Sequence, residues 1–312
     1  MSELASAINA MLVLFIITIV GFVATKCGVL DSTSQERLTK MVFNISLPAT
    51  LLASVTDLDA GSLASQVPLA VGLSVLQFFL LLGIGALACL VLRVPKAQRI
   101  PYLFMSICTN TGFIGLPVAT SIYGSQAAIL SAIFIAIIGF LMYLIGIPMI
   151  AKGGEGDAAS TGPAWRQAIN PPSIASLIAL GIFFTGLSLP QPIADAASMI
   201  GASTAPVAMM VIGIILANAP LRDVVSELRL YPFILIRQLI APAIVYFVLR
   251  LFIHDDLMLG VFTVMLAMPT GSMASSFMAM FGWDTTLPAS GTILATIASF
   301  PIIPALLWAM SL

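Results

Sequence analysis

Residues 110–117 read NTGFIGLP and lie in the middle of a long apolar segment of the chain. Two glycines and a proline within eight residues weaken a helix, because proline removes a backbone donor and glycine has no side chain to hold the backbone. A second stretch, MPTGS at residues 268–272, interrupts another apolar segment, and Ser275 and Ser276 follow one turn later. Inside a bilayer, such breaks are tolerated only where protein or a water-filled cavity satisfies the freed backbone groups. The two stretches therefore predict a pair of broken helices around a buried polar site.

The composition indicates that these segments lie in a membrane. Of 312 residues, 60% are hydrophobic and 8% are charged, whereas an ordinary soluble domain is about 25% charged. A soluble chain must present a wettable surface, while a chain in lipid can leave its outer surface apolar. The formal net charge is -1 and no basic stripe is present. Nucleic acid is therefore excluded as a partner, and the lipid bilayer is the expected surroundings.

The apolar segments are long enough for ten membrane spans. A helix needs about 20 mostly apolar residues to cross a hydrocarbon core about 30 Å thick. By that rule the spans are residues 5–25, 38–56, 66–92, 101–123, 127–150, 172–189, 198–217, 231–253, 258–281 and 286–311. The sequence thus predicts an all-α membrane protein of ten transmembrane helices. The two interrupted stretches fall in helices four and nine.

Lysine and arginine indicate the orientation, because basic loops are retained in the cytoplasm. These residues gather after spans one, three, five and seven, while the alternate loops are acidic or neutral. We therefore expect a multi-pass protein of the bacterial inner membrane with both termini outside. The loop at 151–171 is then cytoplasmic, and its Gly/Ala/Ser/Pro-rich composition is typical of a flexible linker.

That linker divides the chain into two halves of five spans each. The first half is residues 1–150 and the second is residues 172–312. Because each half has an odd number of spans, any repeat between them must be inverted in the membrane, as in several carrier folds. Prolines recur at a similar separation and give modest support for such a repeat, in the pairs Pro48 with Pro206, Pro117 with Pro269, and Pro148 with Pro301. We therefore expect two inverted five-helix repeats.

The two breaks supply the main candidate binding residues. A half-helix that begins at a break exposes N–H groups and a partial positive charge, which suit a carboxylate without any buried lysine. The alternative is a proline kink that only shapes packing, which is common in membrane helices. The candidates for substrate binding are Asn110, Thr111, Gly112, Gly115, Pro117, Pro269, Thr270, Gly271 and Ser272.

Polar residues in other spans have two interpretations each. Asn44 and Pro48 place an amide and a kink one turn apart on one helix face, and they are further candidates for the cavity; a bond from Asn44 across a helix interface is an equal alternative. Gln77 favours an interhelical hydrogen bond. Arg237 lies near the cytoplasmic end of span eight, so its side chain is expected to snorkel to the interface. The alternative is that Arg237 attracts anions into the inner vestibule or pairs with Glu227.

No enzyme, cofactor or metal pattern is present in the sequence. There is no Walker loop, GxSxG or HExxH pattern, and the three cysteines have no ligand spacing. No Asp or Glu falls near the middle of any predicted span, which weakens the case for a buried protonation switch. Coupling to Na⁺ through carbonyls and hydroxyls, for example those of Thr292 and Thr296, stays open, as does uniport.

Six segments, in order, resemble the signature segments of the auxin efflux carrier family, including its bacterial members. They are MVFNISLPATLL (41–52), NTGFIGLPVATSIYG (110–124), NPPSIASLIALGIFFTGLSLP (170–190), PVAMMVIGIILA (206–217), RQLIAPA (237–243) and AMPTGSMASSFMAMFG (267–282). The family lies within the bile acid/sodium symporter-like inverted-repeat carriers. Asn110 and Pro117 match the family's crossover motif, and Pro269 matches its partner.

The resemblance implies that broken helices four and nine cross at the substrate site. It also implies an elevator-like movement of a transport domain against a scaffold formed by spans one, two, six and seven, through which a homodimer could form. Plant members move auxin, bacterial relatives are associated with malonate and malate, and the short central loop here is of the bacterial type. We therefore expect a secondary transporter of a small organic anion, a mono- or dicarboxylate. The alternatives are an anion channel, which would show ion-like conductance, and a membrane receptor or scaffold, which would bind without flux.

Overall fold

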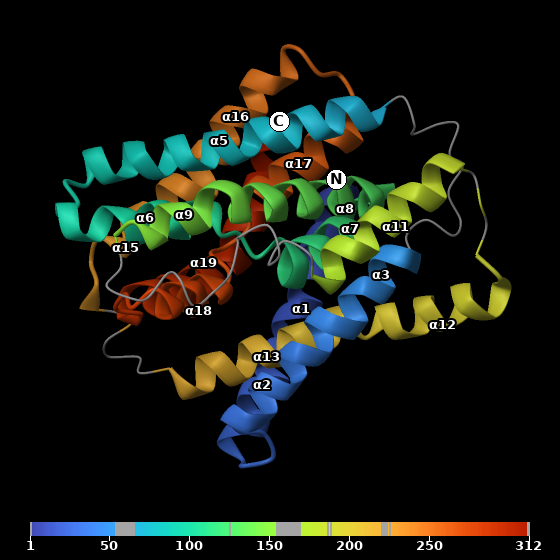
Figure 1. Cartoon of the computed structure of the whole chain (residues 1–312), viewed down its shortest axis with the longest axis horizontal. Coiled ribbons are helices and arrows are strands. Elements are labelled where there is room, and N and C mark those ends of the chain that lie inside the picture. Colours follow the sequence, from blue (N-terminus) through green and yellow to red (C-terminus); the bar gives the residue numbers. More distant parts are fainter. Residues whose placement is uncertain are drawn as a thin grey trace.

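The computed structural model describes residues 2–53, 66–124, 126–153, 170–185, 189–219 and 226–310, together with residues 187 and 224. These residues are almost entirely helical, and they contain no β-strand apart from one isolated bridge between Thr109 and Thr270 (Figure 1). Five of the described helices are long and apolar enough to cross a membrane, at Val67–Val91, Gln126–Ala151, Gln191–Asn218, Leu230–Arg250 and Thr286–Met310. The expected all-α membrane protein is confirmed, while the number of ten spans and their inverted repeat stay predictions.

The described helices follow the predicted spans closely. In the first half they are α1 (Ser2–Lys26), α2 (Ser32–Met41), η1 (Val42–Ser46), α3 (Leu47–Ala53), α5 (Val67–Val91), η3 (Lys96–Gln98), α6 (Arg99–Ile107), η4 (Thr111–Gly115), α7 (Leu116–Tyr123), α8 (Gln126–Leu141), η5 (Met142–Gly146) and α9 (Ile147–Ala151). In the second half they are α11 (Pro171–Thr185), α12 (Gln191–Ala202), α13 (Thr204–Asn218), α15 (Leu230–Leu235), η7 (Ile236–Ile240), α16 (Ala241–Arg250), α17 (Asp256–Ala267), α18 (Met273–Met280) and α19 (Thr286–Met310). Most of the linker predicted at 151–171 lies outside the described residues.

Four of these helical segments are π-helical turns, and each ends two residues before a proline. The turns η1, η4, η5 and η7 precede Pro48, Pro117, Pro148 and Pro242, respectively. Proline has no N–H to donate, and its ring clashes with the carbonyl group of the preceding turn in a regular α-helix. A wider π-helical turn makes room for the ring while the helix continues. These prolines therefore shape their helices without ending them.

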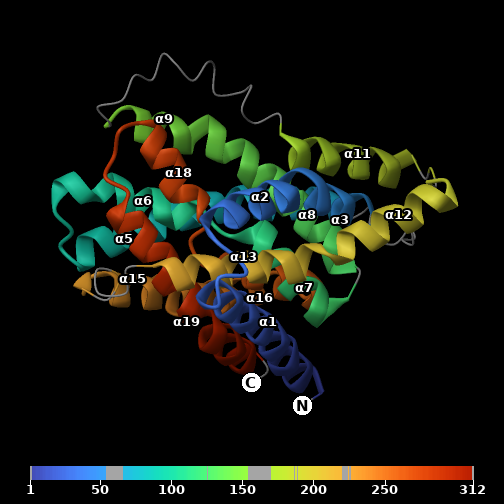
Figure 2. The same ribbon diagram turned by 90° about the horizontal axis from the view of Figure 1, so that it is seen from below.

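The helices predicted as spans one, two, six and seven pack against each other. α1 packs along α13, and α3 packs against α11 and α12 (Figures 1 and 2). Where α1 and α13 meet, a Cβ atom on Gly213 would lie 2.2 Å from the backbone oxygen of Thr18. A Cβ on Gly21 would lie 2.4 Å from the backbone oxygen of Met210. Small residues of this kind let membrane helices approach at backbone distance.

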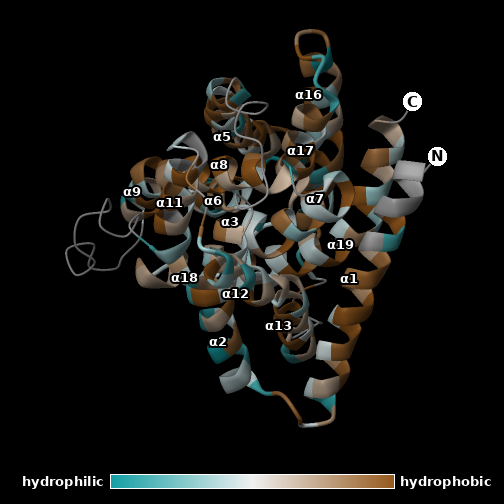
Figure 3. Cartoon of the chain, turned by 90° about the vertical axis from the view of Figure 1, so that its right-hand side faces the viewer, coloured by the Kyte–Doolittle hydropathy of each residue, from teal (hydrophilic) through white to brown (hydrophobic). Residues whose placement is uncertain are grey.

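The remaining helices surround the two breaks. α5 packs on α6 and α8, α17 packs on α8 and α16, and α15 and α18 pack on α19. α1 also contacts α19, and the two run side by side toward the two chain ends, which lie close together (Figure 2). Hydrophobic residues dominate the outer face of α1 (Figure 3), where Ile16 and Val20 are more than half exposed. An exposed surface of that kind suits contact with lipid.

Candidate functional site

The two broken helices meet. Residues 108–110 separate α6 from η4, and residues 268–272 separate α17 from α18. The two non-helical segments pair in antiparallel fashion, with the backbone N–H of Asn110 donating to the oxygen of Pro269 at 2.8 Å. The N–H of Gly271 likewise donates to the oxygen of Cys108 at 2.8 Å. Each break thus satisfies backbone groups of the other, as a break inside lipid requires.

The first break lies upstream of the position expected from the sequence. The expectation placed it within residues 110–117, but the structure has a π-helical turn at Thr111–Gly115 and then α7, of which Pro117 is the second residue. The wide turn accommodates the proline, so the Gly/Pro-rich stretch stays helical. The chain instead leaves the helix at residues 108–110, where the segment around Pro269 offers hydrogen-bonding partners.

Both half-helices begin at the paired breaks. In the first, Ile114 N–H and Gly115 N–H return to the oxygen of Asn110 at 3.2 and 3.1 Å. The N–H groups of residues 111–113 precede this bond and have no acceptor within the helix. In the second, Ala274 N–H returns to Gly271 O at 3.0 Å, so the N–H groups of residues 272 and 273 are also free of intrahelical bonds. Two N-terminal helix ends with free donors therefore lie together at the crossing.

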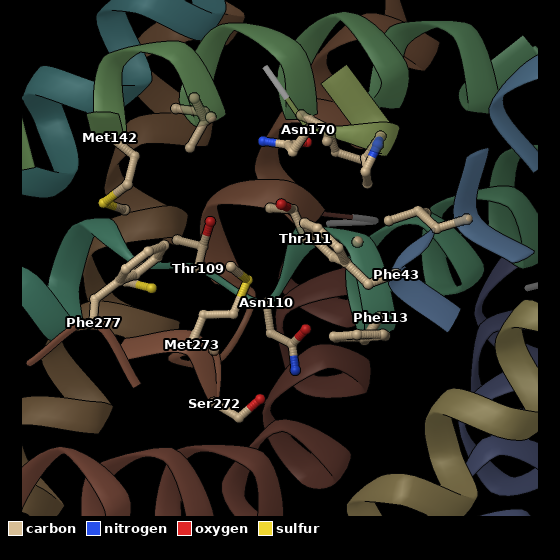
Figure 4. A pocket seen from close by; sticks show the side chains of 18 of the residues that line it. Phe43, Thr109, Asn110, Thr111, Phe113, Met142, Asn170, Ser272, Met273 and Phe277 are labelled. Carbon is tan, nitrogen blue, oxygen red and sulfur yellow. The ribbon is translucent and has the colours of Figure 1, made fainter. Parts of the chain in front are cut away.

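A cavity of about 130 Å³ lies beside the crossing (Figure 4). Its walls come from both breaks and from residues of spans two, five and six. They are Phe43, Leu47, Cys108, Thr109, Asn110, Thr111, Gly112, Phe113, Ile135, Ile138, Gly139, Met142, Tyr143, Asn170, Pro172, Gly271, Ser272, Met273 and Phe277. None of these residues carries a charge at neutral pH, and most are apolar. The cavity thus combines an apolar wall with backbone N–H donors and a few neutral polar groups.

Asn110 is the polar residue at the centre of the site. Its side chain is 7% exposed, and it borders both this cavity and a smaller one of about 20 Å³ against α13 and α19. Its amide projects between Phe113 and Ser272 (Figure 4) and makes no hydrogen bond within the part of the chain that the structure describes. Because this amide borders the cavity and has no protein partner there within the described ranges, it is well placed to bind a ligand.

Hydroxyl groups hold the crossing together. Thr270 Oγ1 donates to the backbone oxygen of Met105 at 3.0 Å, and Thr292 Oγ1 donates to that of Gly271 at 3.3 Å. Thr296 Oγ1 bonds back to Thr292 O at 2.7 Å. The hydroxyl of Thr109, by contrast, is buried and has no hydrogen-bond partner among the described residues. Thr109 is therefore a cavity residue that the sequence reasoning missed, although it immediately precedes the motif that was singled out.

The expectation that the side chain of Arg237 snorkels to the membrane interface is wrong, because this side chain is buried inside the protein. Its side chain is 1% exposed, and its Nε and Nη2 donate to the backbone oxygen of Ser106 at 3.2 Å each. Its Nη1 donates to the backbone oxygen of Met268, and no ion pair with Glu227 is present among the described residues. The side chain turns toward the breaks because their free carbonyl groups offer acceptors inside the protein.

Similarity to known proteins extends over nearly the whole chain. A family model described as "Membrane transport protein" matches residues 6–307. The chain belongs to this membrane transport protein family. It is the auxin efflux carrier family that the six motifs resemble.

Two archaeal relatives are named uncharacterized transporters. One, from Methanocaldococcus jannaschii, is 25% identical over 313 residues, which cover 96% of this chain and 97% of the relative. The other, from Methanothermobacter thermautotrophicus, is 24% identical over 312 residues, covering 97% and 98%. Family membership and relatives together identify this chain as a multi-pass membrane protein of a transport family, and they point away from an enzyme.

In this membrane transport protein, close packing explains why glycine occupies positions 112 and 115. A Cβ on Gly115 would lie 2.8 Å from the sulfur atom of Met265, so this glycine lets the end of η4 pack on α17. A Cβ on Gly112 would lie 3.0 Å from a methyl group of Leu47, at the cavity wall. Both positions favour a residue without a side chain for packing, whatever role they have in binding.

Five of the eleven predicted candidates line the cavity, namely Asn110, Thr111, Gly112, Gly271 and Ser272. The other six do not line it, and they are Gly115, Pro117, Pro269, Thr270, Asn44 and Pro48. Asn44 is exposed, and its Nδ2 donates to the backbone oxygen of Lys40 at 2.9 Å, one turn earlier. Pro48 follows the turn η1, and neither residue lines the cavity, although Phe43 and Leu47 of the same helix do. A role of Asn44 and Pro48 in binding stays a prediction. The interhelical bond expected of Gln77 is confirmed, since its Nε2 donates to the oxygen of Phe262 at 3.1 Å.

Further cavity residues come from places where the sequence shows no break. Tyr143 lies in η5, and Asn170 immediately precedes α11. Tyr143 lies five residues before Pro148, and Asn170 lies directly before Pro171, so a polar residue close to a proline was the available signal. Gln238 was also missed: it is fully buried beside Arg237, and its Nε2 donates to Ala295 O at 3.2 Å and Ala267 O at 3.4 Å.

Proposed function

We propose that this protein is a secondary transporter that carries a small organic anion, a mono- or dicarboxylate, across the inner membrane by alternating access. The observation that carries the proposal is the pairing of two broken helices whose N-terminal ends line one uncharged cavity. Broken helices that meet within a repeat-built carrier are the usual location of a transported solute. The membership in a transport family supports the same function.

The chemistry of the cavity favours a carboxylate. The donors at the crossing are the N–H groups of residues 111–113 and the amide of Asn110. Helix N-termini attract anions through these donors and through the helix dipole. The lining carries no acidic side chain that would repel an anion and no basic side chain that would hold it too tightly. Aromatic and methionine side chains such as Phe43, Phe277 and Met142 suit the hydrocarbon part of an organic acid.

The packing of the helices supports an elevator movement. We propose ten spans in two inverted repeats, with spans one, two, six and seven as the scaffold. The cavity lies between Phe43 and Leu47 of span two, with Pro172 of span six, on one side and the two breaks on the other. Sliding the helices that carry the breaks along the scaffold would move the cavity toward either membrane face. A homodimer through the scaffold helices remains part of the proposal.

A ligand screen followed by flux measurement tests the function. Purified full-length protein is heated with a panel of mono- and dicarboxylates and with their neutral amides. We expect a concentration-dependent rise in melting temperature with at least one acid and none with its amide, because the helix ends select for charge. The best acid should then show saturable uptake and counterflow in proteoliposomes. Ion-like conductance without counterflow would indicate a channel, and binding without flux would indicate a receptor.

The orientation can be tested with a native cysteine. Cys27 is exposed at the end of α1, whereas Cys89 and Cys108 are buried. We propose that both termini face outside, which places Cys27 on the cytoplasmic side. A membrane-impermeant maleimide should therefore label inside-out vesicles and spare intact spheroplasts, with a Cys27→Ser variant as the control. Labelling of spheroplasts that disappears in Cys27→Ser would reverse the proposed orientation.

A further inference from the structure

Arg237 is a buried cation without a carboxylate partner among the described residues. The two ion pairs in that part of the chain, Lys40 with Glu36 and Arg250 with Asp256, are elsewhere and exposed. Burial of an unpaired charge in an apolar interior is strongly unfavourable. Some other source of negative potential must therefore hold the guanidinium in place.

That source is the carbonyl ends of the two broken helices. Ser106 lies in the last turn of α6, and Met268 directly follows α17. The last carbonyl groups of a helix lack intrahelical donors and carry a partial negative charge. Arg237 donates to both of these oxygens, and so a single guanidinium bridges two helix C-termini. The N-termini of the other two half-helices face the cavity.

Neighbouring carbonyl groups are satisfied in the same way. Thr270 Oγ1 donates to Met105 O, and Gln238 Nε2 approaches Ala267 O at 3.4 Å. Backbone carbonyl oxygens that converge at a helix break are the ligands that a monovalent cation would use in a carrier. Here side chains of this chain already occupy them, and the positive charge among these side chains belongs to Arg237.

We propose that the guanidinium of Arg237 is a tethered replacement for a coupling cation, which joins the C-terminal ends of both broken helices and offsets the charge of one bound carboxylate. This inference rests on the proposed transport function and deepens it in two ways. Transport should need no Na⁺, because the carbonyl groups that would bind it are occupied. The preferred substrate should be a monoanion, because one fixed cation compensates one negative charge.

The position of Arg237 suits that role. Cys108, two residues after Ser106, lines the cavity, so the guanidinium lies behind the cavity wall and does not contact the ligand directly. In a low-dielectric interior its charge is still felt across that distance. Arg237 is therefore a positioning residue, which acts on the anion through the helix ends and the local potential.

The main experiment compares uptake by full-length protein in proteoliposomes in Na⁺, K⁺ and N-methylglucamine buffers. The wild type should give equal rates in all three buffers, and a monocarboxylate should compete better than a dicarboxylate of equal length.

Arg237→Lys keeps the charge but cannot donate to two carbonyl groups in a fixed fork, so uptake should fall several-fold. Arg237→Met should lose about tenfold or more, because two buried acceptors lose their donors. Millimolar guanidinium should restore part of this loss.

Three outcomes of that experiment would overturn the inference. They are Na⁺-dependent uptake by the wild type, wild-type rates in Arg237→Met, and a folded Arg237→Met protein whose uptake guanidinium leaves unchanged. Should Arg237→Met fail to fold, the buffer series on the wild type and the Arg237→Lys variant still decide the question.

A second measurement separates this inference from the proposed function, because it needs no transported substrate. Guanidinium, with choline as the reference cation, should raise the melting temperature of purified Arg237→Met and leave the wild type unchanged. Arg250→Met is the matched control, since Arg250 pairs with Asp256 at the surface and its removal should create no site. Guanidinium stabilisation without any organic-acid transport would refute the proposed function and keep the cation site. Transport without guanidinium stabilisation or rescue would refute the cation site alone.

Discussion

The contact between α1 and α13 and the contact between the two breaks are built in opposite ways. At the first, Gly21 and Gly213 allow backbones to touch, and both helices keep their own hydrogen bonds. At the second, two helices give up hydrogen bonds and pair their freed segments through Asn110 and Gly271. The first contact relies on close packing, and the second relies on polar groups that need partners.

This difference suits the two contacts to different roles, the first to mechanical support and the second to binding a solute. A dry contact between regular helices leaves no group for a solute to bond, so it suits a part that stays rigid. The crossing keeps free donors and an unpartnered amide beside a cavity, so a solute can complete its hydrogen bonds. Four predictions test this comparison, beginning with the largest expected effect.

Gly213→Ala should cause the largest loss of stability. Its Cβ would lie 2.2 Å from Thr18 O, and a backbone atom can give way only if α1 moves. Overpacking of this kind costs about 1–3 kcal/mol. Gly83→Ala is the matched control, because nothing lies within 4 Å of its Cβ position. Thermal unfolding in detergent measures both, and equal melting temperatures would mean that the α1–α13 contact is not tight.

Asn110→Ala should impair binding and leave stability unchanged. The amide has no partner within the described residues, so removing it should not weaken the fold, whereas a bound carboxylate would lose one hydrogen bond. We expect the KM for uptake to rise about tenfold, in line with about 1–3 kcal/mol for a buried polar partner. Asn218→Ala, at the exposed end of α13, serves as the control. An unchanged KM in a folded Asn110→Ala protein would remove Asn110 from the site.

Pro269→Ala should slow turnover more than Pro117→Ala. Pro269 lies in the non-helical segment and its oxygen accepts the bond from Asn110 N–H, whereas Pro117 lies within α7 after a π-helical turn. Alanine frees the backbone around Pro269 and should reduce the rate about two- to fivefold. Single-turnover and steady-state uptake measure this effect. Normal rates in both variants would mean that the prolines only shape packing.

Loss of the Asp31 carboxylate charge should have the smallest effect, because Asp31 caps the start of α2 and does not line the cavity at the crossing. Its Oδ1 accepts hydrogen bonds from Ser34 N–H and Ser34 Oγ at 2.7 Å each, and these bonds lower the pKa of the Asp31 carboxyl below its usual value. A lowered pKa means that this stabilisation is present above the unfolded pKa of about 4 and is lost as pH falls through the folded value. The hydrogen-exchange protection factors at α2 should be constant from neutral pH to pH about 5 and fall in stronger acid. Asp31→Ala should exchange faster at neutral pH with unchanged uptake, and equal exchange would mean that the cap contributes nothing.

Much of the fold followed from local patterns. The predicted spans agree with the described helices to within a few residues in most places, because the length of an apolar run and the thickness of a bilayer are one-dimensional quantities. Glycine and proline also indicated correctly which two helices are interrupted. They misplaced the first break, because a π-helical turn can absorb Pro117, and the choice of Cys108–Asn110 depended on a partner from the other half of the chain.

By itself the sequence determined the membrane environment, the helices, which two of them are interrupted, and the family. Only the tertiary structure decided the direction of individual side chains. The sequence around an arginine does not show whether its side chain reaches the interface or is buried. The carbonyl groups of Ser106 and Met268 become acceptors for Arg237 only after the helices that carry these residues have packed together. Asn44 and Asn110 likewise look alike in sequence, and helix packing alone placed the first at the surface and the second at the cavity. Spacing along a chain fixes which residues share a helix face, whereas the neighbour that this face meets depends on how distant segments pack.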